Sequence, residues 1–455
     1  MAGIGFELRK LLQKHSFGGD STALFYASII AAGPWIACML CLASISVYAS
    51  FHINQSGVER FRSIVIYSYC FSAILVGLLQ LVVTRYMADQ YYIRRYDKTL
   101  PSFLNISAVV GVASALVAAL AYSRLPMPAV QAFWGCLLFI AVCLTWVSMI
   151  YIGVIRDYKT LVVAFFGGTF LAIAAAVLLG RAFQFTGYLA GFTIGQFTIY
   201  ILILAKLLTE FRCRNLFDRE TFTSFATYKE LIAIGVLLNL TLWIDKIIFW
   251  YAPESRSVLG MIRVNDVYDT LSFYAYLTIL PSMGIFLLRM ETSFNEHYND
   301  YFGTIISKSP MRQILKQKKS LIDDLRVNLR YLFTIQVTIS GVCIVFSGKI
   351  IEHLHFLPFY APIFRALLFG AFLQALTMTI IVILFYFDQR KKVLASIFTF
   401  FFLMASLSIL SIRLGSQYYG YGYAVANLIA LCIVMQCLEG TLKNLEYISF
   451  TQQLI

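Results

Sequence analysis

The chain has 455 residues and a formal net charge of +13; 60% of its residues are hydrophobic and only 13% are charged. Soluble domains carry about 25% charged residues, so this chain cannot cover a water-exposed surface of its size, which excludes a soluble globular protein. The apolar runs reach about twenty residues, the length of a membrane-spanning helix, and lack the alternating ten-residue segments typical of membrane β-barrels. We therefore expect an all-α polytopic membrane protein.

The hydropathy pattern predicts twelve transmembrane spans. The first run is too long for the hydrophobic core of a signal peptide, so it is expected to remain as an anchor. The expected spans are 22–50, 62–84, 101–123, 127–155, 160–180, 183–208, 229–251, 270–290, 328–354, 361–387, 393–412 and 417–440.

The distribution of Lys and Arg predicts the orientation of these spans. The N-terminus, the even-numbered loops and the C-terminal tail hold 26 of the 36 basic residues, whereas the odd-numbered loops hold 8. Because basic loops stay on the cytoplasmic side, both termini are expected in the cytoplasm. The positive charge also attracts anionic membrane lipids. Without a basic soluble module, we expect no nucleic-acid binding.

The spans divide into six and six around a charged linker. Each half has an even number of spans, so both halves enter the membrane from the same side, as in a parallel duplication. Such a repeat suits a rocking transporter, although it is also compatible with a purely structural role. The expected parts are an amphipathic N-terminal helix (1–18), a six-helix bundle (19–209), a cytoplasmic linker (210–228) and a second six-helix bundle (229–455) containing a cytoplasmic helical loop (291–327).

Short similar segments in the two halves indicate candidate residues for a substrate pathway. Arg85 ends span two in VVTRYMADQYY, and Arg289 ends span eight in FLLRMETSFNEHY. Aromatic rings with a phenol hydroxyl suit stacking on sugar rings, with core packing as the alternative. The tyrosines concerned are the Tyr-x-Tyr pairs of the same two spans, Tyr67, Tyr69, Tyr274 and Tyr276. The cluster SQYYGYGYA at 416–424 is interpreted as an ordinary interfacial belt.

Span seven contains a pair of charges, Asp245 and Lys246, in TLWIDKIIFWY (241–251). A charge at the bilayer centre costs roughly 2.5–3.5 kcal/mol on insertion scales, so charges within spans tend to be functional. Neighbouring residues lie about 100° apart around a helix, so we expect them not to face each other well. With Asn239 and Thr241 they form a polar stripe, which is expected to line a cavity as a gate or substrate contact. Simple pairing with neighbouring helices is the alternative.

Two breaks within spans are candidate hinges. Gly33 and Pro34 lie within span one, and Pro281 lies within span eight in ILPSMG. Proline frees a backbone carbonyl, and such breaks are tolerated near cavities or packed helices. A kink beside a moving pathway and a fixed structural kink both fit this pattern.

Two basic segments are expected to be amphipathic helices. The segment SKSPMRQILKQKKSLIDDLRVNLR, from Ser307, is expected to lie on the inner leaflet, with docking of a cytosolic partner as the alternative. The N-terminal GIGFELRKLLQK is expected to form a second interfacial helix.

No cofactor, metal site or enzymatic activity is expected. The sequence lacks a G-x-x-x-x-G-K-[ST] phosphate loop. Its 9 cysteines show no metal or redox spacing and are interpreted as small buried residues. A glycosyltransferase would need an extramembrane domain with carboxylates, and the outer loops are too short for one.

Four segments resemble the PelG family of the multidrug/oligosaccharidyl-lipid/polysaccharide (MOP) flippase superfamily, and the resemblance runs through the whole chain. The segments are MAGIGFELRKLL at the start, GPW from Gly33, WIDKIIFW from Trp243 and ETSF from Glu291. The resemblance implies a MATE-like fold of twelve helices in two six-helix bundles, with a V-shaped cavity. Asp245 and Lys246 match the family's span-seven motif, and no catalytic residue carries over.

The same resemblance implies a function in a bacterial inner membrane. The cargo would be a Pel-like polysaccharide rich in N-acetylhexosamine, made by a cytosolic PelF-like glycosyltransferase and exported with inner-membrane Pel partners that include a cyclic-di-GMP receptor. We therefore expect a polysaccharide translocator. One alternative is an ion-coupled drug or lipid-oligosaccharide antiporter of the same superfamily, with Asp245 as the ion site. The other is a scaffold for a polysaccharide synthase.

Overall fold

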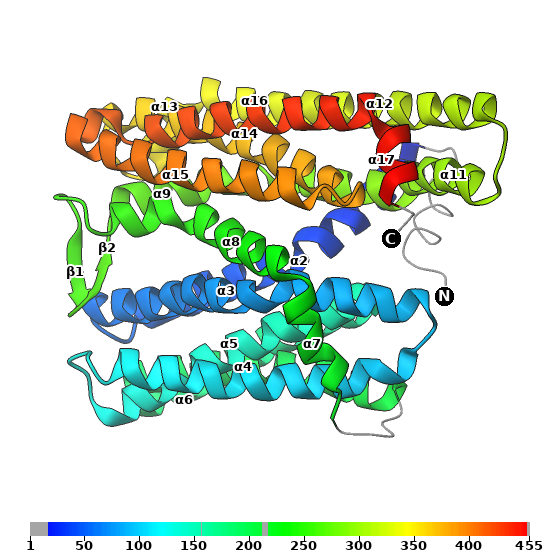
Figure 1. Cartoon of the computed structure of the whole chain (residues 1–455). Helices are drawn as coiled ribbons and strands as arrows, with labels where there is room; N and C mark the ends of the chain where they lie inside the picture. Colours follow the sequence, from blue (N-terminus) through cyan, green and yellow to red (C-terminus); the bar gives the residue numbers. More distant parts are fainter. Residues whose placement is uncertain (1–16, 156, 212–216, 453–455) are drawn as a thin grey trace. The chain divides into compact units, whose positions relative to one another are not determined.

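The computed structural model describes residues 17–155, 157–211 and 217–452, and the chain is almost entirely helical there (Figure 1). The amphipathic helix expected at 1–18 lies almost wholly outside these residues. The first helices are α2 (Phe17–Ser50), α3 (Gln55–Tyr92), η1 (Tyr96–Lys98), α4 (Thr99–Tyr122), α5 (Ala129–Ile155), α6 (Tyr158–Glu210), α7 (Arg219–Thr227) and α8 (Lys229–Phe249). The later helices are α9 (Asp266–Leu277), α10 (Leu280–Arg289), the π-helical turn η2 (Met290–Phe294), α11 (Asn295–Ile306), α12 (Met311–Val345), α13 (Ser347–His353), η3 (Pro358–Tyr360), α14 (Ala361–Tyr386), α15 (Arg390–Leu414), η4 (Ser416–Tyr418), α16 (Tyr421–Lys443) and α17 (Leu445–Gln452).

A small β-hairpin departs from the all-α expectation. Strands β1 (Arg256–Leu259) and β2 (Ile262–Val264) pair antiparallel between α8 and α9, with Gly260 in the left-handed region at the turn. The side chains of Leu259 and Ile262 are buried, so the hairpin closes over apolar residues. The expected spans end at 251 and resume at 270, and no strand was expected between them, because two strands this short give almost no periodic signal.

Ten helices among the described residues are long and apolar enough to cross a membrane. One of them, α6, is two antiparallel arms joined at Gln184, whose φ of 50° and ψ of −128° are not helical. In a straight helix Gly168 and Gly195 would lie about 40 Å apart, yet a Cβ at Gly195 would be 2.7 Å from the Gly168 oxygen. The chain therefore reverses at Gln184, next to the turn that was expected between 180 and 183, and small residues let the arms pack closely.

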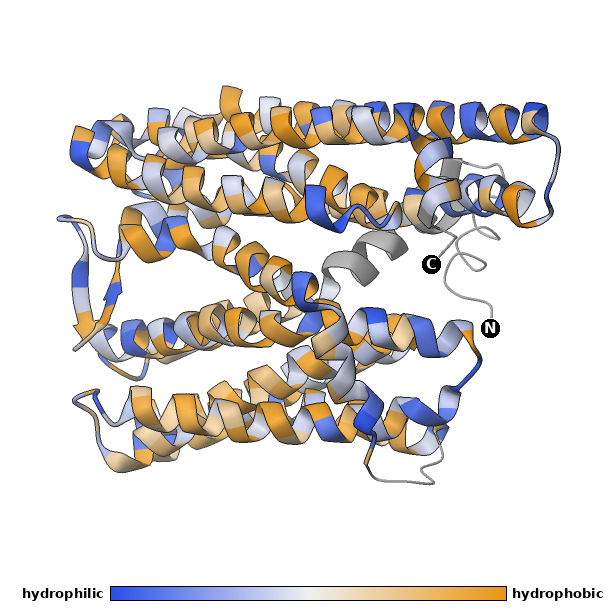
Figure 2. Ribbon diagram, in the orientation of Figure 1, coloured by the Kyte–Doolittle hydropathy of each residue, from blue (hydrophilic) through white to orange (hydrophobic). Residues whose placement is uncertain are grey.

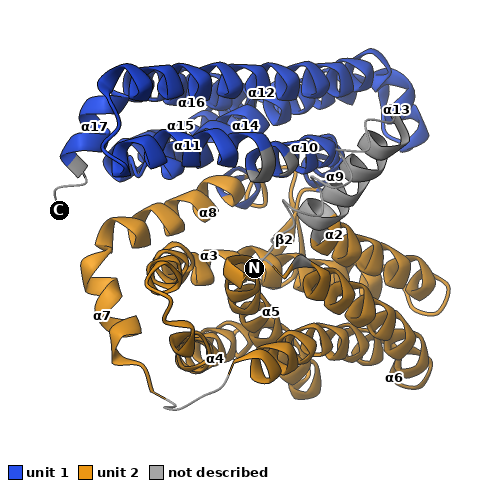
Figure 3. Ribbon diagram, turned by 90° about the vertical axis from the view of Figure 1, so that its right-hand side faces the viewer, with its two compact units in different colours: residues 1–32, 244–248, 266–455 blue, residues 33–243, 249–265 orange. Residues whose placement is uncertain are grey.

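The chain forms two compact units (Figure 3). Unit 1 comprises residues 1–32, 244–248 and 266–455, and unit 2 comprises residues 33–243 and 249–265. This division differs from the expected halves, 19–209 and 229–455, because most of α8 belongs to unit 2. The reason is a close crossing with α3: a Cβ at Gly235 would lie 2.2 Å from the backbone oxygen of Gly77.

Each unit is built around one helix that is mostly buried. In unit 2 this helix is α5, where 72% of the residues in its apolar 18-residue stretch are buried inside the protein. In unit 1 it is α14, where the same share is 83%. In the other candidate spans among the described residues the share is only 22–39%. The two helices correspond to the fourth and tenth expected spans, so they hold the same position in the two expected sets of six spans. Each central helix is apolar on nearly all sides, as a helix surrounded by others must be.

The basic segment after Ser307 is helical, as expected, but it is not a separate helix. It forms the first half of α12, which runs without a break from Met311 to Val345 and changes from hydrophilic to hydrophobic along its length (Figure 2). The residues near 330 include neither glycine nor proline, the two residues that most strongly disfavour a helix, so no helix breaker stands where the apolar span begins. The expectation of a helix lying flat on the inner leaflet is therefore wrong.

The linker between the expected halves is anchored to unit 2 by Asp218, whose side chain is buried. Lys98 Nζ donates to Asp218 Oδ1 at 2.8 Å, and Tyr86 and Thr221 donate to Oδ2 at 2.5 and 2.7 Å. Burial raises the pKa of the Asp218 carboxyl, but these hydrogen bonds outweigh it and hold the pKa below its ordinary value. The ionised carboxylate therefore fastens the start of α7 to α3 and η1.

Candidate functional site

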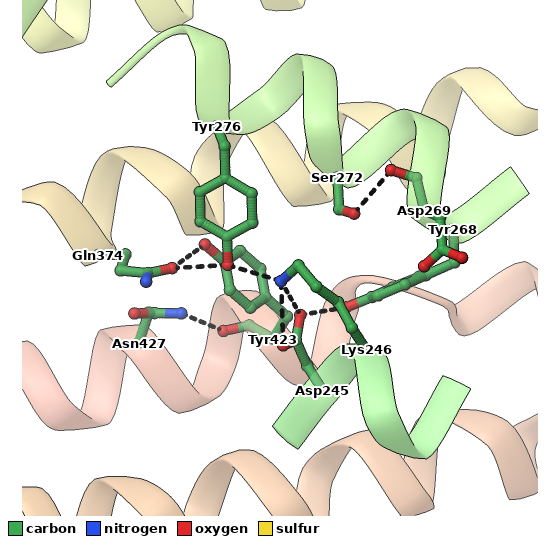
Figure 4. Close-up of polar contacts among 9 residues, drawn as sticks. All are labelled: Asp245, Lys246, Tyr268, Asp269, Ser272, Tyr276, Gln374, Tyr423 and Asn427. Carbon is green, nitrogen blue, oxygen red and sulfur yellow. Dashed lines mark hydrogen bonds and ion pairs between the residues drawn. The ribbon is translucent and has the colours of Figure 1, made fainter. Parts of the chain in front are cut away.

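Asp245 and Lys246 contact each other directly (Figure 4). The ammonium of Lys246 lies 3.1 Å from Asp245 Oδ2 and 3.2 Å from Oδ1. The expectation that they cannot face each other was wrong. The long, flexible lysine side chain bends back toward the carboxylate, which compensates for the 100° between the two Cβ directions. Both residues lie in the part of α8 that belongs to unit 1.

The pair belongs to a hydrogen-bonded network of side chains from α8, α9, α14 and α16 of unit 1 (Figure 4). Tyr268 donates to Asp245 Oδ2 at 3.0 Å. Lys246 donates to the hydroxyl of Tyr276 at 3.1 Å, and its ammonium lies 4.3 Å from the centre of that ring. The contact combines a charge-assisted hydrogen bond with a cation–π interaction.

The network continues through Gln374. Tyr276 donates to Gln374 Oε1 at 3.1 Å, and Tyr423 donates to the same oxygen. Tyr276 and Tyr423 also pack edge-on, with ring centres 6.2 Å apart. Nearby, Asn427 Nδ2 donates to the backbone oxygen of Tyr423 at 2.9 Å. One Gln374 oxygen thus fixes two phenols, and one of these phenols holds the ammonium.

The ion pair is largely enclosed by protein. The side chain of Asp245 is 1% exposed and that of Lys246 is 13% exposed. An isolated charge would be very costly here, whereas a paired and hydrogen-bonded one is tolerated. The arrangement matches the alternative of pairing with neighbouring helices more closely than it matches a charge lining an open cavity.

Unit 2 contains a smaller polar cluster around Tyr69. The Tyr69 hydroxyl donates to Gln196 Oε1 at 3.0 Å and lies 3.1 Å from the sulfur of Cys38. Trp146 packs edge-on against the Tyr69 ring and donates its indole N–H to Ser72 Oγ at 3.0 Å. The contacts described join aromatic, amide, thiol and hydroxyl groups, and they include no Asp, Glu, Lys or Arg side chain.

The other expected pathway residues of unit 2 have local structural contacts. Tyr67 stacks on Trp250 with ring centres 4.2 Å apart, and its hydroxyl bonds both the backbone nitrogen and the backbone oxygen of Arg263, at 3.0 and 2.8 Å. These two hydrogen bonds fasten β2 to α3. Asn239 Nδ2 donates to the backbone oxygen of Gly235 at 2.9 Å, and Thr241 to that of Leu237 at 2.6 Å. The expected polar stripe is thus partly satisfied by the helix itself.

Tyr274 and the two arginines do not join the network. The Tyr274 ring packs edge-on against Phe273, with ring centres 5.4 Å apart. Arg289 stacks over the ring of Tyr331 in unit 1, its guanidinium carbon 4.8 Å from the ring centre. In unit 2, Arg85 pairs with Asp89 at 3.2 Å one turn further along α3. Of the expected pathway residues, Asp245, Lys246 and Tyr276 are brought together.

The candidate hinges lie at structural boundaries. Unit 2 begins at Gly33, directly before Pro34, which lies inside α2. The expected interruption of span eight is also present: α9 ends at Leu277, and α10 begins at Leu280 with Pro281 in its first turn. Proline at this position needs no hydrogen-bond partner for its nitrogen.

The sequence interpretation missed three residues of the network. Tyr423 was assigned to an interfacial belt, but it is 3% exposed and bonded to Gln374. Gln374 is an amide in the middle of a long apolar span, a signal that was available and unused. Tyr268 lies just before the expected start of span eight and carried no comparable signal. Among the described residues, no group of three or more His, Cys, Asp and Glu side chains is arranged to hold a metal ion.

Comparison with known proteins gives the family and the fold. The chain matches the PelG family, described as "Putative exopolysaccharide Exporter (EPS-E)", over residues 1–450. No curated protein matches the sequence. The family match covers nearly the whole chain and includes both units.

Several solved transporters have a similar structure. An outward-facing multidrug resistance MATE family transporter of the MOP superfamily has a TM-score of 0.66 at 13% identity, covering 92% of this chain and 96% of that chain. A MOP superfamily transporter from Pyrococcus furiosus has a TM-score of 0.65 at 12% identity, covering 93% and 96%. A mutant of the Vibrio cholerae MATE transporter VcmN has a TM-score of 0.63 at 12% identity, covering 94% and 99%. At these identities the likeness concerns the fold alone. The chain is therefore a multi-pass membrane protein of the PelG exopolysaccharide exporter family, with a MATE-like fold.

Proposed function

We propose that this protein translocates a Pel-like polysaccharide, rich in N-acetylhexosamine, from the cytoplasm to the periplasm across a bacterial inner membrane. The observation that carries the proposal is the family match over residues 1–450, on a chain with a transporter fold. The polymer would be supplied by a cytosolic PelF-like glycosyltransferase, and inner-membrane partners would include a cyclic-di-GMP receptor. The fold supports transport because the same architecture serves in MATE transporters.

We further infer twelve membrane crossings in two parallel bundles of six. The ten candidate helices include α6, whose two arms cross the membrane once each, so they supply eleven crossings. The helix α2 supplies the twelfth. The central positions of α5 and α14, six spans apart, support a duplication. The excess of Lys and Arg in the even-numbered loops and at the chain ends supports cytoplasmic termini.

Within this scheme Asp245 and Lys246 act as a gate pair rather than as sugar ligands. Their charges satisfy each other and the phenols of Tyr268 and Tyr276, so they offer few free groups to a passing polymer. Opening would require this network to exchange partners. Gly33, Pro34 and Pro281, which lie at boundaries of units and helices, are the places where the chain would bend.

The test is polymer secretion by a deletion strain that carries either the wild-type chain or a variant. Polymer inside and outside the cell is measured, together with the amount of protein in the membrane. We expect wild type to restore external polymer and D245A/K246A to abolish export while still inserting. External polymer without any copy of the chain would overturn the proposed function, whereas normal export by a well-inserted double variant would overturn only the gate.

The ion-coupled antiporter remains the second candidate, because Asp245 is a buried carboxylate within a span. Its charge is already neutralised by Lys246 in this conformation, which disfavours it as a coupling site. Uptake of a small cation into proteoliposomes, driven by a proton or sodium gradient, would support the antiporter. Crosslinking of nascent polymer to pathway positions would separate a conduit from a scaffold that only holds the synthase.

A further inference from the structure

The first half of α12 presents a row of exposed basic side chains, here called the basic stripe: Arg312, Lys316, Lys319, Arg326 and Arg330. At 100° per residue these positions fall within about 40° of one line along the helix. Asp323 is the one acidic residue in the row, and it pairs with Arg326 at 3.5 Å. The stripe is therefore strongly positive.

The opposite face of the same segment is held by the rest of unit 1. Ile314, Leu321 and Leu325 are buried on that side. Lys318 donates to Glu446 Oε2 at 2.6 Å and to the backbone oxygen of Lys443 at 3.0 Å, which joins α12 to α17. The segment is thus fixed in rotation, and its stripe is the face that the unit leaves uncovered.

The length of α12 places most of the stripe beyond the reach of lipid headgroups. The next charged residue after Arg330 is Lys349. The 15 uncharged residues from 331 to the end of α12 at Val345 span about 22 Å, which is most of the hydrocarbon thickness of about 30 Å. Arg330 therefore marks one edge of the hydrocarbon. The headgroup layer adds only about 5–8 Å on each side, whereas Lys319 and Arg312 lie about 17 and 27 Å further along the helix.

A tilt does not change this result. Transmembrane helices tilt by about 20° on average, which shortens these distances by less than a tenth. Because α12 is continuous, the distal half of the stripe cannot fold back onto the membrane. Anionic lipids can reach Arg326 and Arg330, but not Arg312, Lys316 and Lys319.

We propose that the distal part of the basic stripe is a docking surface for the acidic face of a cytosolic protein. Charge complementarity favours a partner with an acidic face and accelerates its encounter with the basic stripe. Two exposed apolar side chains flank the row, Leu315 at 45% and Val327 at 61% exposure, and offer the apolar contacts that a charged rim surrounds in protein interfaces. The surface serves this partner whatever cargo the transporter moves.

The test is photo-crosslinking in cells from full-length chains with p-benzoylphenylalanine at Leu315. We expect a protein adduct that falls at least tenfold in K316E/K319E and is unchanged in K229E/K391E, which reverses two exposed lysines elsewhere. Lys substitutions at acidic residues of the crosslinked protein should restore the adduct in the K316E/K319E background. The readout does not depend on polymer export, so it is independent of the proposed function.

Three results would overturn the proposal: adducts with lipid or nucleic acid alone, a protein adduct insensitive to K316E/K319E, or no adduct from a well-inserted chain. A lipid surface predicts a different pattern, in which R326E/R330E is the sensitive pair and K316E/K319E has no effect.

Discussion

Tyr69 and Tyr276 make the same hydrogen bond in two different units. Each phenol donates to a glutamine Oε1, Tyr69 to Gln196 at 3.0 Å and Tyr276 to Gln374 at 3.1 Å. They are the second members of the Tyr-x-Tyr pairs of expected spans two and eight, so the similarity between these two spans extends to the contacts. Only the unit 1 version adds a charged pair, because Lys246 also donates to Tyr276. The two polar clusters are thus related but chemically unequal.

Breaking the ion pair on one side should destabilise the protein more than replacing both charges. In K246M the Asp245 carboxylate keeps Tyr268 but loses its cation, and a broken buried pair costs about 3–5 kcal/mol. D245L/K246M leaves no unpaired charge and should unfold at a higher temperature than K246M. Thermal unfolding in detergent measures both; a double variant less stable than the single one would contradict the pairing.

Tyr276 should stabilise the folded protein through both its ring and its hydroxyl. Y276F keeps the ring beneath the ammonium but loses bonds to Lys246 and Gln374, at a cost of about 1–3 kcal/mol for hydrogen bonds to charged and neutral groups. Y276L also loses the cation–π contact and should be less stable still. Y274F is the control and should unfold like wild type. Equal stability of Y276F and wild type would show that the hydroxyl contacts do not stabilise the folded protein.

The crossing of α3 and α8 should not tolerate a side chain at Gly235. A Cβ there would lie 2.2 Å from the Gly77 oxygen, and backbone cannot move aside cheaply, so G235A should cost about 1–3 kcal/mol. The matched control is G111A in α4, where a Cβ meets nothing within 4 Å. Alanine should stabilise that helix by about 0.5–1 kcal/mol. Similar unfolding temperatures for the two variants would refute the close crossing.

The linker anchor should depend on the ionised Asp218 carboxylate. Its folded-state pKa is depressed, so its contribution is fully present above the ordinary aspartate pKa of about 3.9 and is lost as the pH falls through the lower folded value. At neutral pH, D218N should make the segment 217–228 more sensitive to limited proteolysis. The difference from wild type should vanish at low pH.

Asp97, an exposed acid in η1, provides the control for the anchor. D97N should leave the linker as resistant as in wild type. Equal cleavage of D218N and wild type at neutral pH would mean that the linker is held by other contacts.

Much of the architecture was predictable because hydrophobicity alone decides which segments cross a membrane. The apolar runs, the turn near Gln184 and the interruption at Pro281 were read from residue patterns that act locally. The hairpin at 256–264 was not predictable, because strands this short are stabilised by tertiary contacts such as the bond between Tyr67 and Arg263. The flat amphipathic helix was predicted wrongly, because amphipathicity does not tell where a helix ends.

By itself, the sequence determined that this is a helical membrane protein of a recognisable exporter family, with two charges inside one span. Only the tertiary structure decided what those charges touch. Lys246 reaches back to Asp245 and across to Tyr276, and Gln374 and Tyr423 arrive from helices about 100 residues or more further along the chain. The physical reason is that hydropathy acts on each segment independently, whereas a buried charge is satisfied by whichever side chains the packing of distant helices brings within hydrogen-bonding distance.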